Sequence, residues 1–226
     1  MNVVSVENAT KIYHLGQTQI TALKNINLEV SEGEFVSVVG PSGSGKTTLL
    51  NLLGCLDQPT SGTVKIENRE VAALSHNQLA DLRAERIGFI FQTFNLIPVL
   101  SAAENVEYPL LQKRRVGNSK ERRAKVLEIL GSVGMGELSH HRPNELSAGE
   151  QQRVAVARAL VTEPKIVLAD EPTANLDHEA GAIVLNLMRK LNQDRGTTFI
   201  FATHDPEIVR LAERVITLRD GVIVEK

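Results

Sequence analysis

The sequence predicts an α/β fold built on a mostly parallel sheet that is covered by helices on both faces. Short apolar runs typical of buried strands alternate with helical patterns from residue 35 onward, except in one helical stretch. One of these runs leads directly into a glycine-rich loop and then a helix. Apolar residues form 42% of the 226 residues, which is enough for a substantial core. In such folds the ligand lies outside the carboxyl ends of the strands.

Each element follows from the spacing of apolar residues. Short Val- and Ile-rich runs indicate strands, and apolar residues that recur every three to four positions indicate helices. A polar stretch around residues 16–21 joins the first two strands, and Asp220-Gly221 predicts the turn of a C-terminal hairpin. The predicted strands span residues 3–7, 26–30, 35–39, 63–67, 87–91, 166–169, 198–202, 215–218 and 222–224. The predicted helices span residues 46–53 and 151–161 and include Ala180, Val184, Leu187 and Leu191.

The middle of the chain predicts a helical insertion rather than a part of the sheet. Residues 101–133 have a helical pattern that is broken at 116–118. We expect a single domain over residues 1–226, with a helical insertion at approximately 95–160.

Composition argues against a nucleic-acid partner. The formal net charge is −2, aromatic residues form only 4% of the chain and Trp is absent, so neither bulk charge nor base stacking favours such binding. A basic stretch, Lys113-Arg114-Arg115 followed by Lys120-Glu121-Arg122-Arg123, is interpreted as a solvated helical face. Proximity to lipid headgroups is an alternative that the sequence does not require.

The single cysteine, Cys55, excludes an internal disulfide and fits a reducing compartment. Its leucine neighbours predict a buried, unreactive thiol. The N-terminus lacks a basic-then-apolar pattern, and no apolar run approaches the roughly 18 residues of a spanning helix. We therefore expect a cytoplasmic protein that reaches a membrane only through a partner.

A glycine-rich loop with the sequence GPSGSGKT at residues 40–47 matches the pattern G-x-x-x-x-G-K-[ST]. Its glycines let successive backbone N–H groups point at phosphate oxygens, Lys46 reaches the outer phosphates, and the Thr47 hydroxyl is a ligand for Mg²⁺. The alternative is an ordinary glycine-rich turn, but the preceding strand and following helix favour a nucleotide site. The predicted nucleotide-binding residues are Gly40, Ser42, Gly43, Ser44, Gly45, Lys46, Thr47 and Thr48.

A second apolar strand ends in two acids, Asp170 and Glu171. Adjacent carboxylates on a pleated strand point in different directions, so two roles are plausible. We expect Asp170 to hold Mg²⁺ through water and Glu171 to polarise the attacking water. On its own such a strand end would be interpreted as solvated, and the nearby glycine loop changes that interpretation.

Residues 146–150, LSAGE, resemble the signature of the ATP-binding cassette (ABC) ATPases, and the resemblance extends over residues 3–224. The resemblance implies a P-loop NTPase core, an N-terminal antiparallel β subdomain and the helical insertion. It also implies a homodimer in which Ser147, Ala148, Gly149 and Glu150 of one subunit grip the γ-phosphate of ATP held by the other. Two residues depart from the family: Ala148 stands where Gly is usual, and Glu150 where Gln is common.

Further positions match the family one by one. Gln92 matches the glutamine that contacts Mg²⁺ and senses the γ-phosphate, and His204 matches the switch histidine that orients Glu171. Tyr13 matches the aromatic that stacks on adenine, although a lone Tyr is more often a packing residue. The D-loop at the dimer seam corresponds to Asn175, Leu176 and Asp177. The resemblance thus implies an ATPase with Glu171, His204, Gln92 and Lys46 as catalytic residues and Thr47, Gln92 and Asp170 around Mg²⁺.

Three stretches, GCLD at 54–57, FNLIP at 94–98 and ADEPT at 169–173, resemble the macrolide-exporter and lipoprotein-releasing subgroup. This implies an integral membrane permease partner, at the inner face of the cell membrane, and export or extraction of a cargo. The apolar residues of 94–109 predict either a groove for a permease helix or the packing of the insertion onto the core.

Other classes of protein contain the same ATPase domain and are alternatives to a transporter. A DNA-repair ATPase would carry long coiled coils between the two motifs, and a translation factor would carry two cassettes; neither fits this sequence. A non-transport regulator of the cell-division type, acting with a permease-like partner, remains an alternative.

Overall fold

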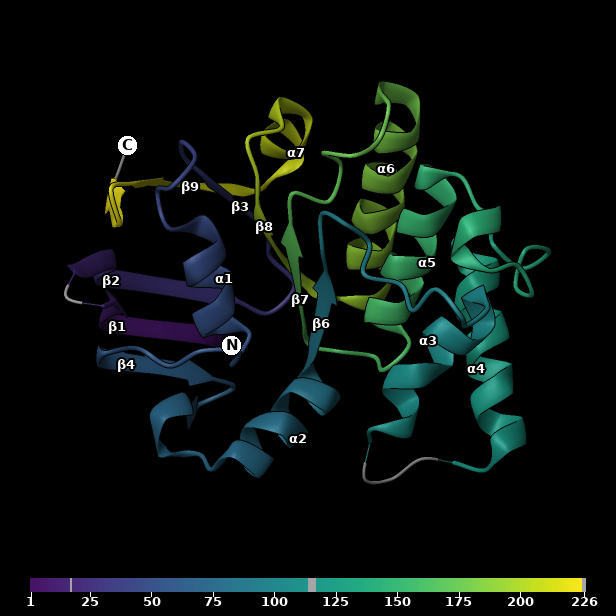
Figure 1. Cartoon of the computed structure of the whole chain (residues 1–226), viewed down its shortest axis with the longest axis horizontal. Helices are drawn as coiled ribbons and strands as arrows, with labels where there is room; N and C mark the ends of the chain where they lie inside the picture. The colour runs from purple at the N-terminus through teal and green to yellow at the C-terminus, as the bar shows by residue number, and fades with distance from the viewer. Residues whose placement is uncertain (17, 114–116, 225–226) are drawn as a thin grey trace.

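The computed structural model describes residues 1–16, 18–113 and 117–224, so Arg114, Arg115 and Val116 of the predicted basic stretch and helix break lie outside the described residues. The described chain forms two sheets and a group of helices that packs on one side (Figure 1). The helices are α1 (Lys46–Leu53), α2 (His76–Arg86), α3 (Ala102–Leu111), α4 (Ser119–Ser132), α5 (Ala148–Leu160), α6 (His178–Arg195) and α7 (Pro206–Leu211).

The larger sheet confirms the predicted mostly parallel architecture. Its strand order is β10-β9-β3-β8-β7-β6, and each pair from β9 through to β6 is parallel. Only β10 joins in the antiparallel sense, through the predicted C-terminal hairpin. The strands are β3 (Phe35–Val39), β6 (Ile87–Ile90), β7 (Ile166–Asp170), β8 (Thr198–Ala202), β9 (Arg214–Arg219) and β10 (Val222–Val224).

The smaller sheet is the antiparallel N-terminal sheet that the resemblance implied. Its order is β2-β1-β4-β5, with β1 (Asn2–Leu15), β2 (Thr18–Ser31), β4 (Ser61–Ile66) and β5 (Arg69–Glu70). The first two strands are far longer than the predicted 3–7 and 26–30, because pairing continues to Tyr13 opposite Ile20 and beyond. The predicted polar joining stretch is mostly strand. Its described residues are exposed, so the alternation that marks a half-buried strand is missing there.

Two helices of the structure, α2 and α7, were not predicted from the sequence. Helix α2 buries only Leu79 and Leu82, so its apolar stripe is too thin to give a clear period. A start signal was present, since Ser75 and Gln78 form a reciprocal capping box at its N-terminus. Helix α7 is a single short segment of six residues. It begins with Pro206 after the capping residue Asp205.

Two apolar clusters hold the larger sheet rigid. One joins α1 and the smaller sheet to one face, and the other packs α3, α4, α5 and α6 against the opposite face. Three phenylalanines form the centre of the second cluster: the ring of Phe35 lies 4.6 Å from Phe201 and 5.7 Å from Phe199, centroid to centroid. Because both faces are packed, the carboxyl ends of β3, β7 and β8 form a fixed edge for a site.

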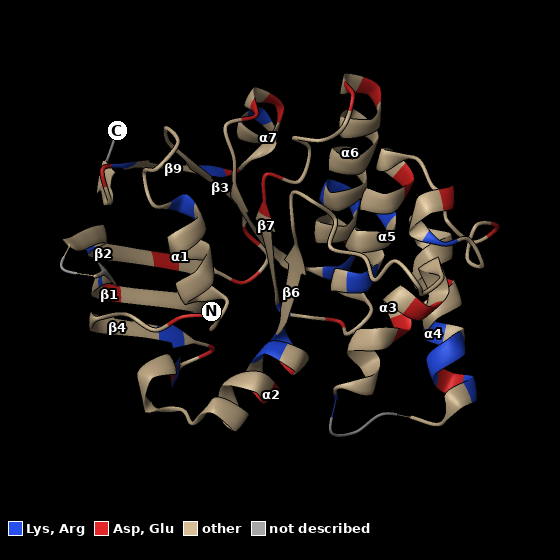
Figure 2. Ribbon diagram, in the orientation of Figure 1, with Lys and Arg blue, Asp and Glu red and all other residues tan. Residues whose placement is uncertain are grey.

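Charges of both signs are interspersed over the described elements (Figure 2). Lys120 and Arg123 of α4 are exposed, as expected for a solvated helical face. Lys113 departs from that interpretation, because its ammonium is half-buried and donates to the carbonyl of Thr162 at 2.6 Å. Among the described helices, none combines the length and apolarity that a membrane crossing requires.

Candidate functional site

The start of α1 presents unpaired backbone donors. Helices α2 to α7 each begin with a Ser, Asn or Asp side chain that accepts a backbone N–H, whereas α1 begins at Gly45 with no side-chain cap. The N–H groups of Lys46, Thr47 and Thr48 therefore have no acceptor within the helix. Together with the helix dipole they form a site suited to phosphate.

Gly45 is required for the shape of this loop. Its φ is +104°, which L side chains rarely adopt, and a Cβ atom there would lie 2.6 Å from the carbonyl oxygen of Ala22 in β2. The glycine loop therefore packs directly against the smaller sheet. The ammonium of Lys46 curls over the same loop and donates to the carbonyls of Gly40 at 2.8 Å and Pro41 at 3.1 Å.

Thr47 and Asp170 meet from two different elements. The Thr47 hydroxyl, in the first turn of α1, donates to Asp170 Oδ2 at the end of β7 over 2.9 Å. Burial raises the pKa of Asp170, and the charge of Glu171 adds to this, although the bond from Thr47 opposes it. A hydroxyl beside one carboxylate fits Mg²⁺, which favours oxygen ligands and takes most of the others from water and phosphate.

Glu171 is held in an unusual backbone conformation. Its φ is +46°, and its N–H donates to the carbonyl of Ala202 in β8 at 2.8 Å. One carboxylate oxygen accepts from the buried Thr203 hydroxyl at 3.0 Å, and the other lies 2.7 Å from Nδ1 of His204. Non-glycine residues in this region cost free energy and concentrate at active sites. In this arrangement Glu171 lines the same cavity as the glycine loop.

These groups surround one cavity of about 670 Å³ at the carboxyl ends of the larger sheet's strands. It is lined by every predicted residue of the glycine loop and by the predicted residues of the strand ends. Three lining residues of β2 were missed, because Ile20 and Thr21 lie in the predicted polar joining stretch and Ala22 lies between it and the predicted strand at 26–30. The lining residues are Ile20, Thr21, Ala22, Gly40, Pro41, Ser42, Gly43, Ser44, Gly45, Lys46, Thr47, Thr48, Gln92, Asp170, Glu171 and His204.

Of the predicted D-loop residues, Asn175 contacts a residue that lines this cavity. The Asn175 side chain donates to the backbone carbonyl of Gln92 at 2.8 Å, so it fixes the loop that carries the predicted sensor. Leu176 packs against the second apolar cluster, and Asp177 caps α6 by accepting from the N–H of Ala180 at 2.8 Å.

Tyr13 does not line the cavity. Its hydroxyl donates to Asp57 Oδ2 at 2.9 Å, and the Lys11 ammonium lies 5.0 Å from the centre of its ring. Burial and the neighbouring Asp57 raise the pKa of Tyr13. Its predicted role under adenine stays a prediction.

The signature residues also lie outside the cavity of their own chain. Ser147 is the exposed N-cap of α5, followed by exposed Ala148 and half-buried Gly149 and Glu150. The buried Gln152 joins the helix to the segment after β7, because its amide donates to the carbonyl of Pro172 at 2.7 Å. Ser147 is therefore placed on a rigid, outward-facing helix end.

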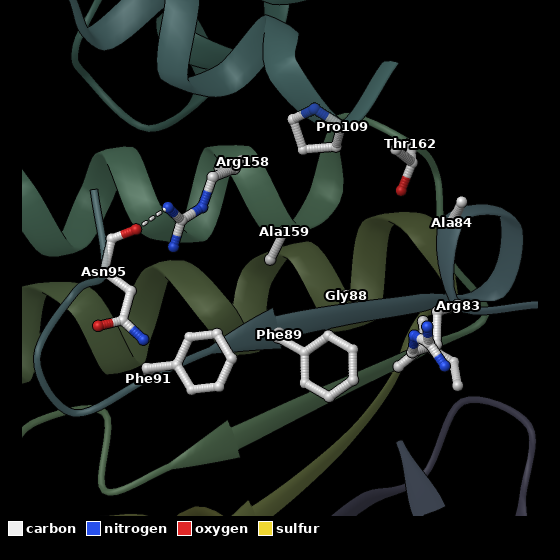
Figure 3. A pocket seen from close by; sticks show the side chains of 11 residues that line it. Arg83, Ala84, Gly88, Phe89, Phe91, Asn95, Pro109, Arg158, Ala159 and Thr162 are labelled. Atoms are coloured by element: carbon white, nitrogen blue, oxygen red, sulfur yellow. Dashed lines mark hydrogen bonds between the residues drawn. The ribbon is translucent and has the colours of Figure 1, made fainter. Parts of the chain in front are cut away.

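A separate groove of about 220 Å³ lies between β6 and the helices (Figure 3). It is lined by Phe89 and Phe91 on the sheet side and by Pro109 and Arg158 on the helix side. The guanidinium of Arg158 donates to the carbonyls of Phe94 and Asn95 just after Gln92. Burial lowers the pKa of Arg158 to about 10.

Comparison with known proteins is consistent with this geometry. A family model described as ABC transporter matches residues 23–174. The chain is 50% identical over 223 residues to the "Uncharacterized ABC transporter ATP-binding protein MJ0796" of Methanocaldococcus jannaschii, covering 98% of this chain and 95% of that protein. It is 44% identical to the "Macrolide export ATP-binding/permease protein MacB" of Syntrophobacter fumaroxidans, but spans only 31% of that protein's length.

The fold of this chain is also similar to that of a solved ATP-binding cassette. "Dimeric structure of a post-hydrolysis state of the ATP-binding cassette MJ0796 bound to ADP and Pi" superposes with a TM-score of 0.90 at 48% identity. The match covers 98% of this chain and 97% of that one.

Proposed function

This chain belongs to the ABC transporter family, and from that premise we propose that it hydrolyses ATP to ADP and phosphate as the nucleotide-binding subunit of a membrane transport complex. The observation that carries the proposal is the convergence of three groups on one cavity. These groups are the uncapped start of α1, the Thr47–Asp170 pair and the carboxylate of Glu171.

The phosphates of ATP are bound by the free N–H groups at the start of α1 and by Lys46. Thr47, Gln92 and, through water, Asp170 would hold Mg²⁺, which when bound supplies positive charge beside the phosphates. Glu171 accepts a proton from, and orients, the attacking water. One oxygen accepts from the Thr203 hydroxyl and the other contacts Nδ1 of His204, and because a carboxylate has about four acceptor positions, room for water remains.

A second copy of the chain completes each site. Ser147 to Glu150 do not line the cavity of their own chain, so their predicted contact with the γ-phosphate requires a partner arranged head to tail. The dimeric state named for the relative from Methanocaldococcus jannaschii supports this arrangement. Residues 175–177 then lie at the seam, and loss of the γ-phosphate removes the contact that holds the subunits together.

The membrane partner docks at the groove of Figure 3 and the loop that precedes α3. That loop is rigid, because the buried side chain of Asn105 accepts from the N–H of Ile97 and donates to three backbone carbonyls. Leu96 packs on the core, as the packing interpretation predicts, whereas Val99 is 73% exposed, as a docking surface requires. The helical insertion, residues 95–160, would thus transmit permease movements to Gln92.

In this proposal the protein lies on the cytoplasmic face of the membrane through a permease subunit and drives export or extraction. The relation to MacB supports that direction, because MacB is named a macrolide export protein.

Replacing Glu171 by Gln tests the ATPase proposal. The variant should bind Mg²⁺–ATP without turning it over and should elute from a sizing column as a dimer, while the wild type with ADP stays monomeric. A variant that remains monomeric at saturating ATP would refute the proposed clamp.

Permease docking needs its own experiment, which is co-purification of the native complex after Val99→Ser. The matched control is Leu127→Ser, which also alters an exposed apolar residue but lies on α4. Loss of the permease with the first variant alone supports docking at this loop. Equal recovery with both variants refutes it.

A further inference from the structure

We infer that Glu150 restrains ATP-driven dimer closure, because its carboxylate holds the one hydroxyl proton that Ser147 would offer to the γ-phosphate. The inference rests on the proposed function, since it concerns the serine that faces the partner's nucleotide. It assigns a role to one of the two positions at which this signature departs from the family.

The bonds around Ser147 show where its proton goes. Glu150 Oε2 accepts the Ser147 backbone N–H at 2.8 Å and the Ser147 hydroxyl at 2.9 Å, while the Glu150 N–H points back at the hydroxyl oxygen at 3.4 Å. A serine hydroxyl has a single proton. That proton is committed to the carboxylate, and only the lone pairs of the hydroxyl remain for other partners.

Two other helices of this chain begin with a serine cap of the same kind, one paired with glutamate and one with glutamine. At the start of α3, Glu104 Oε2 accepts from both the N–H and the hydroxyl of Ser101, at 2.7 and 2.9 Å. At the start of α2, the amide oxygen of Gln78 accepts the N–H of Ser75 at 2.9 Å. Both residues of that pair are described, and no bond joins the Ser75 hydroxyl to the amide oxygen. The two glutamates thus accept from the serine hydroxyl in this capping arrangement, and the one glutamine of the same kind of cap does not.

Charge acts in the same direction as the hydrogen bond. The bonds from the Ser147 backbone and side chain lower the pKa of Glu150, with smaller contributions from Arg153 and His141, so the residue is ionised at neutral pH. An arriving γ-phosphate must displace a charge-assisted hydrogen bond, which is about twice as strong as a neutral one. It must also approach a carboxylate of like charge.

Replacing Glu150 by Gln removes both effects and keeps the helix cap, because Gln78 caps α2 in the same way. We expect each ATP site to close about tenfold more favourably, which is the difference between a charge-assisted and a neutral hydrogen bond. Since one dimer closes two sites, its dissociation constant should fall by about a hundredfold.

The experiment measures the dimer dissociation constant by sedimentation at saturating Mg²⁺–ATP, with the E171Q variant as the background that prevents turnover. Adding E150Q should tighten the dimer as stated, and the melting temperature without nucleotide should fall by only a few degrees, because the neutral side chain caps α5 more weakly. The matched control is E104Q, which alters the same kind of cap on α3 and should leave the dimer unaffected. Equal dissociation constants with and without E150Q would overturn the inference.

A double-mutant cycle then separates the hydroxyl from charge alone. The S147A variant removes the proton that Glu150 holds and keeps the N–H groups of residues 148 and 149, so closure stays measurable at higher protein concentration. In this background E150Q should tighten the dimer much less than in the Ser147 background, because only the charge repulsion is then left to remove. Full tightening there would mean that Glu150 acts by repulsion only. If E171Q itself forms no dimer with ATP, the proposed clamp fails instead, and the two failures are thereby distinguished.

Discussion

His204 and Glu171 share a short contact across two neighbouring strand ends: imidazole Nδ1 lies 2.7 Å from carboxylate Oε1. The carboxylate is mostly buried, with 16% of its side chain exposed, whereas the histidine side chain is 77% exposed. Both residues line the cavity where the γ-phosphate is expected, so the exposed imidazole supports a carboxylate that is held mainly by the protein interior.

Replacing His204 by Ala should lower the ATPase rate by about 10²-fold, because Glu171 loses the contact that orients it but keeps its bond from Thr203. Steady-state phosphate release measures the effect. The control is His76→Ala, which alters an exposed histidine on α2 and should leave the rate unchanged. A wild-type rate in H204A would show that Thr203 alone positions the carboxylate.

Replacing Lys46 by Ala should weaken ATP binding by about tenfold to a hundredfold, which corresponds to the loss of a hydrogen bond to a charged group. Titration with a fluorescent ATP analogue measures this. The exposed Lys120 on α4 supplies the control, since its replacement by Ala should have no effect. Unchanged affinity in K46A would remove Lys46 from the phosphate site.

Truncation of Phe35 should destabilise the fold strongly. The side chain is fully buried and contacts both Phe199 and Phe201, so Phe35→Ala should cost about 3–5 kcal/mol of unfolding free energy. Phe35→Leu retains more volume and should cost clearly less. Urea denaturation of the two variants checks this order, and equal losses would contradict the packing described.

Cys55 should resist alkylation in the folded protein. The thiol is 3% exposed, and burial raises its pKa to about 11, so only about one thousandth is thiolate at pH 8. Iodoacetamide should label it orders of magnitude more slowly in buffer than in concentrated urea. Rapid labelling of the native protein would show that the loop after α1 opens.

The parts of the site that rest on local motifs were predictable from the sequence. Lys46, Thr47 and Asp170 sit in short patterns whose spacing already specifies strand, loop and helix, and the structure brings them to one edge. The parallel sheet was predictable for a similar reason, since its strands are buried on both faces and therefore continuously apolar.

What depends on long-range pairing was not predictable. Ile20, Thr21 and Ala22 reach the cavity only because β1 and β2 continue as an exposed ribbon without alternation. Residues 61–66 look like any short strand, and nothing local says that they pair with β1 instead of the parallel sheet. Thr203 belongs to none of the sequence motifs described above. Its contact with Glu171 could not be predicted, because it joins the ends of neighbouring strands that are distant in sequence.

The central claim is that Ser147 of one subunit faces the triphosphate bound by the other. The most direct measurement is a crystal structure of the E171Q protein with Mg²⁺–ATP. We predict a head-to-tail dimer with Ser147 Oγ at hydrogen-bonding distance, about 3 Å, from a γ-phosphate oxygen on the partner's glycine loop. A dimer in which Ser147 contacts solvent or its own chain, with both nucleotides bound, would contradict the account.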